Sequence, residues 1–310
     1  MPGWRRLSSF FSLNFIIILA FLIITALLPL IWSSHGVLHI LSIIYMYATM
    51  TLGWSTLAGF VGEVSFGHHV FFGLGAYTTA LLWLNFRLGI PALPISGVVS
   101  LAFAVVVGLL FKRISGVVFT IATLCISEVI KSLFLNWEAV GAGIGLQLNP
   151  LPRIPMITYY YTILAAMVIE AFLAYLIRKS RYGLALFAIK NDPTAAQCLG
   201  IRVIKYKILF LLFGAFFEGV AGGFYALLVC HIEPLTAFDV MLMLNMQLIG
   251  LLGGIATIWG PIVASFLFLL AAQYVIIQFK EIQIIIWGVI MISLIKFMPN
   301  GLAGVLRRRI

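Results

Sequence analysis

The sequence predicts an all-α polytopic membrane protein that forms one transmembrane domain over residues 1–310. Apolar and aromatic residues make up 63% of the chain and charged residues only 9%, which is too little polar surface to cover a soluble globule. The mean hydropathy is +1.17, and apolar runs long enough to cross a bilayer recur along the whole chain. This composition excludes a water-soluble enzyme.

Ten apolar segments, separated by short polar or Gly/Pro breaks, are candidates for membrane-spanning helices. They lie at about residues 12–32, 37–57, 66–84, 92–111, 115–135, 158–177, 208–230, 240–252, 262–279 and 283–299. A regular helix needs about 20 apolar residues to cross the hydrocarbon core, so the segment 240–252 is predicted to be re-entrant or broken. The predicted number of transmembrane helices is therefore nine or ten. The first segment is interpreted as a retained helix, because no small-residue cleavage site follows it.

The distribution of basic residues predicts the topology. With the N-terminus inside, fifteen of the 19 Lys and Arg residues fall on the cytoplasmic side and four on the outer side. Lys and Arg are retained on the cytoplasmic side of membranes, so the net charge of +10 reports membrane orientation and not nucleic-acid binding. We expect a multi-pass protein of a bacterial-type cytoplasmic (inner) membrane with both termini in the cytoplasm.

The largest polar segment, residues 178–207, contains the signals of a short helix. Asp192 is a good N-cap, Pro193 fits the first helical position, Ala195 and Ala196 follow, and Gly200 is suited to end the helix. This pattern predicts an exposed helix at about 193–200 within a cytoplasmic loop. From these residues alone, an ordinary connector held at the membrane surface by its basic residues is the simpler interpretation.

Two glycine-rich breaks, at residues 62–68 and 254–261, resemble each other and divide the chain into two weakly related halves. Paired breaks of this kind often mark a transport pathway between repeats, although chance similarity is as good an account in a chain with 28 glycines. Glycines also permit close helix packing, so the two explanations remain open. The candidate pathway residues are Gly62, Glu63, Ser65, Gly67, His68, Gly73, Glu218, Gly254, Thr257 and Gly260.

Ionisable residues inside a membrane are expensive and functional by default. Glu218 has no partner nearby in the sequence, so we expect a protonated carboxyl or an interhelical hydrogen bond. Glu128 and Lys131 are spaced for an i, i+3 ion pair. His68 and His69 point about 100° apart on a helix, and no third ligand has a zinc spacing, so no metal site is predicted.

Several segments together resemble the M-type membrane permease of branched-chain amino-acid ABC importers. They are GWSTLAGFVGEVSFGHHVFFGLGAYTTALL (53–82), TLCISEVIKSLFLNWEAVGAGIGL (123–146), FFEGVAGGFYALL (216–228) and GLLGGIATIWGPIVASFLFLL (250–270). Thr194-Ala195-Ala196, three residues and then Gly200 are similar to the E-A-A-x-x-x-G loop of ABC importer permeases, with Thr194 in place of Glu. The resemblance implies the ABC importer permease fold, with 193–200 as the coupling helix that docks on an ATPase.

The resemblance also implies the partners and the cargo. The partners would be the lipid membrane, a second homologous permease, two cytoplasmic ATPase subunits and an extracytoplasmic substrate-binding protein, with leucine, isoleucine and valine as cargo. The chain has no G-x-x-x-x-G-K-[ST] motif, so we expect a transport subunit without enzyme activity or cofactor, and ATP and Mg bound by partners. The alternatives are urea or short amides as cargo, a proton-coupled secondary transporter using Glu63 or Glu218, and, least favoured, a metalloenzyme using His68, His69 and Glu63.

Overall fold

The computed structural model describes residues 25–29, 34–278, 283–297, 301, 302 and 304. Its helices are α2 (His35–Ser55), the π-helical turn η1 (Thr56–Val61), α3 (His69–Phe86), α4 (Ala92–Leu110), α5 (Gly116–Asn136), the 3₁₀ turns η2 (Glu138–Val140) and η3 (Ala142–Ile144), α6 (Met156–Lys179), α7 (Arg181–Asn191), α8 (Pro193–Cys198), α9 (Val203–Val229), α10 (Pro234–Ala237), α11 (Val240–Gly253), α12 (Trp259–Gln278) and α13 (Gln283–Phe297). A two-stranded antiparallel ribbon pairs β1 (Leu146–Gln147) with β2 (His231–Ile232).

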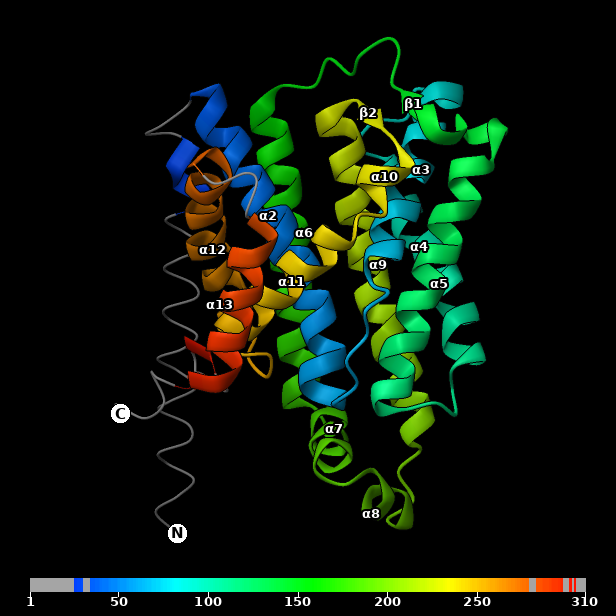
Figure 1. Cartoon of the computed structure of the whole chain (residues 1–310), viewed down its shortest axis with the longest axis vertical. Helices are drawn as coiled ribbons and strands as arrows, with labels where there is room; N and C mark the ends of the chain where they lie inside the picture. The colour runs from blue at the N-terminus through cyan, green and yellow to red at the C-terminus, as the bar shows by residue number, and fades with distance from the viewer. Residues whose placement is uncertain (1–24, 30–33, 279–282, 298–300, 303, 305–310) are drawn as a thin grey trace.

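Helix α9 is the central element of the bundle. It packs against α2, α3, α4 and α6, while α2 also contacts α6, α11 and α12. Figure 1 shows α3, α4 and α5 on one side of α9 and α12 and α13 on the other. Helices α7 and α8 lie at one end of the bundle, the α8 end, and β1 and β2 lie at the opposite end, the ribbon end (Figure 1).

Small residues allow α9 to approach its neighbours closely. A Cβ atom at Gly75 of α3 would lie 2.0 Å from the carbonyl oxygen of Gly219, and one at Gly222 would lie 1.9 Å from that of Phe72. The Ser96 hydroxyl of α4 donates a hydrogen bond to the Gly219 carbonyl at 3.0 Å. Backbone contact and interhelical hydrogen bonds are how helices associate in lipid, so the glycines at this contact allow α3, α4 and α9 to pack closely.

Six helical stretches of the described residues are long and apolar enough to cross a membrane: His35–Val61, Ala92–Leu110, Gly116–Asn136, Met156–Lys179, Val203–Val229 and Pro234–Gly253. They support a polytopic membrane protein, and the number nine or ten stays a prediction. Most of the predicted span 12–32 lies outside the described residues. The segment 240–252 is not broken internally, because α11 runs continuously over Val240–Gly253. The helix is interrupted just before it, at Phe238 and Asp239, and the Asp239 carboxylate caps α11 by accepting from the Met241 N–H at 2.9 Å.

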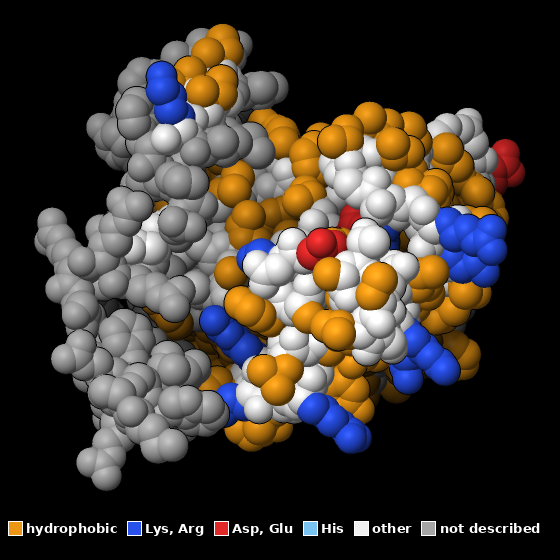
Figure 2. Space-filling model, turned by 90° about the horizontal axis from the view of Figure 1, so that it is seen from below, with side chains coloured by type: hydrophobic (Ala, Val, Ile, Leu, Met, Phe, Trp, Pro, Cys, Tyr) orange, Lys and Arg blue, Asp and Glu red, His pale blue; other side chains and the backbone are white. Residues whose placement is uncertain are grey.

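Basic side chains gather at the α8 end. This end carries Lys112 and Arg113, between α4 and α5, and the basic residues of 178–207, whereas Arg87 and Arg153 lie in loops at the ribbon end. Figure 2 looks onto the α8 end and shows Lys and Arg side chains spread around it. The segregation agrees with the predicted topology, in which the α8 end faces the cytoplasm.

Candidate functional site

The chain leaves helical structure at residues 62–68, which we call the first break. Gly62 ends η1 with φ of +88°, a left-handed conformation that glycine adopts without strain, and α3 begins at His69. An interrupted helix loses its internal hydrogen bonds, and irregular backbone inside a membrane is tolerated only where the protein supplies new partners. The first break therefore needs donors and acceptors from neighbouring helices.

The carbonyl of Ser65 receives two such donors. The indole N–H of Trp54 on α2 donates to it at 2.9 Å, and the amide of Gln247 on α11 donates at 3.4 Å. Trp54, Ser65 and Gln247 are all buried. The middle of the first break is thus held between α2 and α11.

Hydroxyl groups of α5 satisfy the adjoining backbone. Thr120 donates to the Val64 carbonyl at 2.8 Å, and the Thr123 hydroxyl accepts the Phe66 N–H at 3.0 Å. A Cβ atom at Gly67 would lie 2.4 Å from the Thr123 carbonyl oxygen. The glycine at 67 therefore permits this backbone contact, and a bulky side chain there would displace α5.

The second break, residues 254–258, separates α11 from α12. Gly254 has φ of +97°, and its carbonyl accepts both the Thr257 N–H at 3.0 Å and the Thr257 hydroxyl at 2.8 Å. A Cβ atom at Gly260 would lie 2.2 Å from the Gly253 carbonyl oxygen. The second break is a tight turn that is closed by hydrogen bonds between its own residues.

The η1 turn contacts the second break, although the two come from opposite halves of the sequence. A Cβ atom at Gly59, in the η1 turn that leads into the first break, would lie 2.0 Å from the Ile255 carbonyl oxygen and 3.1 Å from the Ala256 Cα. The structure thus places the segment that leads into the first break against the second break. Their role in a pathway stays a prediction.

Glu218 pairs with His68 at the end of the first break. The distance between His68 Nδ1 and Glu218 Oε1 is 2.6 Å, and both side chains are fully buried. The predicted interhelical hydrogen bond of Glu218 is confirmed, since His68 precedes α3 and Glu218 lies on α9. Glu170 of α6 is nearby: its Oε1 lies 3.1 Å from the position of a Cβ at Gly53, where α2 contacts α9 at Gly214.

The polar atoms of this buried group are incompletely paired. Both carboxyl oxygens of Glu170 and Oε2 of Glu218 have no hydrogen-bond partner among the described residues. The side chain of Glu170 is fully buried. In the described part of the chain, no group of three His, Cys, Asp or Glu side chains could hold a metal ion.

Glu63 lies at the α8 end of the first break and is paired with Lys207 at the start of α9. The Lys207 Nζ lies 3.1 Å from Glu63 Oε1, and the other carboxylate oxygen of Glu63 accepts the Gly116 N–H at 3.1 Å. Sequence reasoning missed this pair, because it counted Lys207 only as one of the basic loop residues. No local signal could have revealed it, since the two residues are far apart in the chain.

The remaining candidate glycines have different surroundings. Gly62 is exposed, and its nearest neighbour is Lys190 of α7, whose pKa is lowered by burial and by the nearby Arg178. Gly73 packs against the Phe238 ring, which would lie 2.1 Å from a Cβ at that position. Gly73 is therefore a packing glycine at the contact between α3 and the α10–α11 junction.

Helix α8 has the predicted start and cap, but it ends at Cys198, two residues before the predicted end at Gly200. Its helical residues are Pro193–Cys198, and the Asp192 carboxylate accepts the N–H groups of Thr194 at 2.8 Å and Ala195 at 3.0 Å. Gly200 follows with φ of +82°. The helix is exposed except for Ala196, which is buried, so Ala196 anchors α8 while Thr194 and Gln197 face outward.

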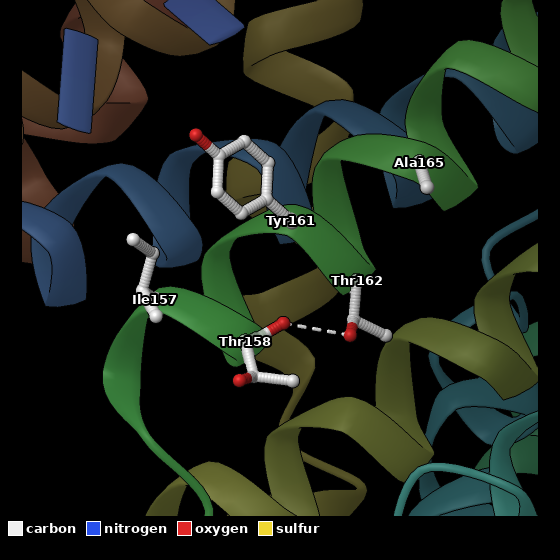
Figure 3. A pocket seen from close by; sticks show the side chains of 5 residues that line it. All are labelled: Ile157, Thr158, Tyr161, Thr162 and Ala165. Atoms are coloured by element: carbon white, nitrogen blue, oxygen red, sulfur yellow. Dashed lines mark hydrogen bonds between the residues drawn. The ribbon is translucent and has the colours of Figure 1, made fainter. Parts of the chain in front are cut away.

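A shallow hollow of about 570 Å³ lies over α6. Figure 3 shows its lining, Ile157, Thr158, Tyr161, Thr162 and Ala165, all on one face of that helix. The Thr162 hydroxyl donates to the Thr158 carbonyl at 2.7 Å, so its polar group is used within the helix. None of the predicted site residues lines this hollow.

Comparisons of the sequence with known proteins identify a family and several relatives. Residues 36–295 match the family described as branched-chain amino acid transport system, permease component. The high-affinity branched-chain amino acid transport system permease protein LivM of Escherichia coli (strain K12) is 25% identical, over 93% of this chain and 75% of the relative. LivM of Salmonella typhimurium is also 25% identical, over 94% of this chain and 75% of its own length.

A more distant similarity covers only part of the chain. The probable branched-chain amino acid transport permease protein LivH of Methanocaldococcus jannaschii is 25% identical over 42% of this chain and 43% of the relative. No solved structure matches the chain.

Proposed function

Since the chain belongs to the permease-component family of branched-chain amino acid transport systems, we propose that it is the membrane subunit of an ATP-driven importer for leucine, isoleucine and valine. The names of the LivM relatives support this cargo. Urea or short amides remain the alternative cargo within the same mechanism. The chain lacks a phosphate-binding motif of its own, so the energy comes from partner ATPases that bind ATP and Mg.

The observation that carries the proposal is the exposed, capped helix α8 at the basic end of the bundle. The Asp192 cap fixes the first turn of α8 without help from the rest of the protein. Beside it, Leu184 and Phe187 of α7 and Leu199 are 76%, 71% and 79% exposed. Large apolar side chains around a short exposed helix form a docking surface for a partner protein. We assign this surface to the two cytoplasmic ATPase subunits.

The transport mechanism follows from the position of α8 between α7 and α9. Closure of the ATPases on ATP moves α8, and the movement passes into α9, which contacts α2, α3, α4 and α6. Rigid-body rocking of such helices switches access to a central site from one side of the membrane to the other. A second, homologous permease completes the pathway, and an extracytoplasmic binding protein delivers the amino acid at the ribbon end.

The two breaks are the proposed part of this chain that faces the amino acid. A zwitterion needs helix N-termini for its carboxylate, carbonyl groups for its ammonium and an apolar wall for its side chain. Helices α3 and α12 both begin directly after a break, at His69 and Trp259. Their N-termini are the dipoles that we propose for the carboxylate.

The proposal is tested by Leu199→Asp in the complete complex. A charge in the centre of an apolar contact is expected to weaken ATPase binding by about tenfold or more, as the loss of a hot-spot contact does. Co-purification of the ATPases with the membrane subunits measures it. Leu235→Asp is the matched control, because Leu235 is 57% exposed at the opposite end in α10, and ATPase binding is expected to remain unchanged.

A second measurement separates the proposal from a proton-coupled transporter. Proteoliposomes that contain the full complex are expected to accumulate leucine only when ATP is present on the ATPase side. Accumulation by this chain alone, driven by a proton gradient, would contradict the proposal and favour titration of a buried carboxyl such as Glu218.

A further inference from the structure

The Glu63–Lys207 pair joins three parts of the chain at the α8 end. Besides Glu63, Lys207 Nζ donates to the Ile114 carbonyl between α4 and α5, and it lies 4.0 Å from the centre of the Phe119 ring. Glu63 in turn accepts the Gly116 N–H at the first residue of α5. The pair therefore ties the first break to the starts of both α5 and α9.

Both members of the pair are largely withdrawn from water. The side chain of Lys207 is 7% exposed and that of Glu63 is 14% exposed. At this exposure the removal of one partner leaves a poorly hydrated charge without its counter-ion, and that is more costly than the loss of a surface ion pair. The two side chains are thus constrained to move together.

Lys207 is stiffly connected to α8. The Leu199 N–H donates to the Ala195 carbonyl at 3.2 Å, and the Ile201 N–H donates to the Ala196 carbonyl at 3.0 Å. These bonds leave little slack between α8 and the first turn of α9, which begins at Val203. A displacement of α8 is therefore carried to Lys207.

The first break and the preceding η1 turn also contact the segment that comes before α8. A Cβ atom at Gly62 would lie 3.9 Å from the Lys190 Cα near the end of α7, and the Arg178 guanidinium lies 5.8 Å from the centre of the Phe60 ring in η1. The start of the first break is thus in contact with the segment before α8, at Lys190, and with the segment after it, at Lys207. Of these contacts, only the Glu63–Lys207 pair is a direct bond to a side chain of the break.

We propose that Glu63 and Lys207 are a positioning pair, which transmits the movement of α8 to the first break. The inference deepens the proposed function and depends on it. In the resting state the pair fixes the start of the first break, next to Val64 and Ser65, whose carbonyls are held by α5 and by α2 and α11. When α8 moves, Lys207 draws Glu63 with it and shifts this segment relative to the second break.

The test uses Lys207→Met, Glu63→Gln and Lys207→Arg in proteoliposomes that contain both permeases, both ATPases and the loaded binding protein. Lys207→Met and Glu63→Gln are expected to lower the amount of leucine transported per ATP hydrolysed by about tenfold, within the range of measured coupling between sites. The KM for the loaded binding protein and the amount of co-purified ATPase are expected to stay unchanged. Lys207→Arg keeps the positive charge and is expected to retain most of the coupling.

The double variant Glu63→Gln/Lys207→Met keeps the test decisive if a single variant fails to fold. It buries no unpaired charge, so it is expected to fold and to couple no worse than the weaker single variant, as two residues that act as a unit do. Glu128→Gln and Lys131→Met are the matched controls, because this pair is 45% and 21% exposed on α5, and coupling is expected to be unaffected.

Two results would overturn the inference. One is a normal transport-to-ATP ratio in the double variant. The other is an equal loss of coupling in the Glu128 and Lys131 controls. A failure of the proposed function looks different, because the wild-type complex itself would then show no ATP-driven uptake.

Discussion

The two breaks satisfy their exposed backbone in opposite ways. The first break depends on side chains of other helices. Trp54 and Gln247 donate to the Ser65 carbonyl, and two threonine hydroxyls of α5 bond to the backbone of the residues on either side of Ser65. The second break is held by internal hydrogen bonds, because both the N–H and the hydroxyl of Thr257 donate to the Gly254 carbonyl. The first is therefore sensitive to movement of the surrounding helices, whereas the second is a rigid corner.

This difference suggests a division of labour between the halves of the chain. A segment whose hydrogen bonds come from α2, α5 and α11 changes its conformation when these helices shift. A self-contained turn keeps its shape and provides a fixed surface for the other to move against. The close approach of Gly59 to Ile255 is where the two surfaces meet, so it is the first place to test.

The largest effect is expected from Gly59→Ala. The added Cβ would lie 2.0 Å from the Ile255 carbonyl oxygen, a backbone atom, so η1 and the second break must separate. Overpacking costs about 1–3 kcal/mol and more when backbone has to move, and we expect a large fall in the melting temperature of the detergent-solubilised protein. Gly36→Ala is the control, since nothing lies within 4 Å of its added Cβ. Equal melting temperatures for the two variants would show that η1 and the second break are not in firm contact.

The next effect is expected from Glu218→Leu, which removes the anchor of His68 at the end of the first break. The substitution leaves the buried His68 ring without its partner, and a buried polar group without a partner costs about 1–3 kcal/mol. The nearby Glu170 carboxyl already has no hydrogen-bond partner among the described residues. Glu218→Gln keeps a hydrogen-bonding group of similar size and is expected to lose much less stability. Thermal unfolding of both variants measures the difference, and a larger loss for the Gln variant would contradict the role of the hydrogen bond.

Sequence reasoning identified the local features of this molecule well. The Asp192 cap, the Pro193 start and the left-handed Gly200 of α8 are all local signals, and the structure has each of them. The Glu128–Lys131 pair on one helix face was predicted for the same reason. Both breaks were placed by their glycines.

Contacts between segments that are far apart in the chain could not be predicted from the sequence. Nothing near Glu218 points to His68, and nothing near Glu63 points to Lys207, because these pairs depend on how whole helices cross. The β1–β2 ribbon has two residues on each strand, Leu146–Gln147 and His231–Ile232, too few for any alternating pattern to show. The number of membrane spans depends in part on residues such as 12–24, which lie outside the described structure.

A smaller loss is expected from Trp54→Phe. The substitution removes the indole N–H that binds the Ser65 carbonyl, which keeps only the longer bond from Gln247 at 3.4 Å, and the expected cost is about 1–2 kcal/mol. Trp83→Phe removes the same kind of bond, to the Pro150 carbonyl, in an exposed position where water replaces it, so its cost is expected to be below about 0.5 kcal/mol. A comparable fall in melting temperature for both variants would mean that the burial of the Ser65 carbonyl contributes nothing.

The sharpest comparison comes from the same substitution in each break, and its member in the second break, Thr257→Val, has the smallest expected effect. Thr257→Val leaves the Gly254 carbonyl with the Thr257 N–H, so the expected loss is about 0.5–1 kcal/mol. Thr123→Val leaves the Phe66 N–H without the hydroxyl that accepts it in the structure, so the expected loss is about 1–3 kcal/mol. Val has nearly the shape of Thr, so the difference reports the hydrogen bonds. If thermal unfolding ranks Thr257→Val as the more damaging variant, the second break is the one that depends on its surroundings, and the proposed division of labour is reversed.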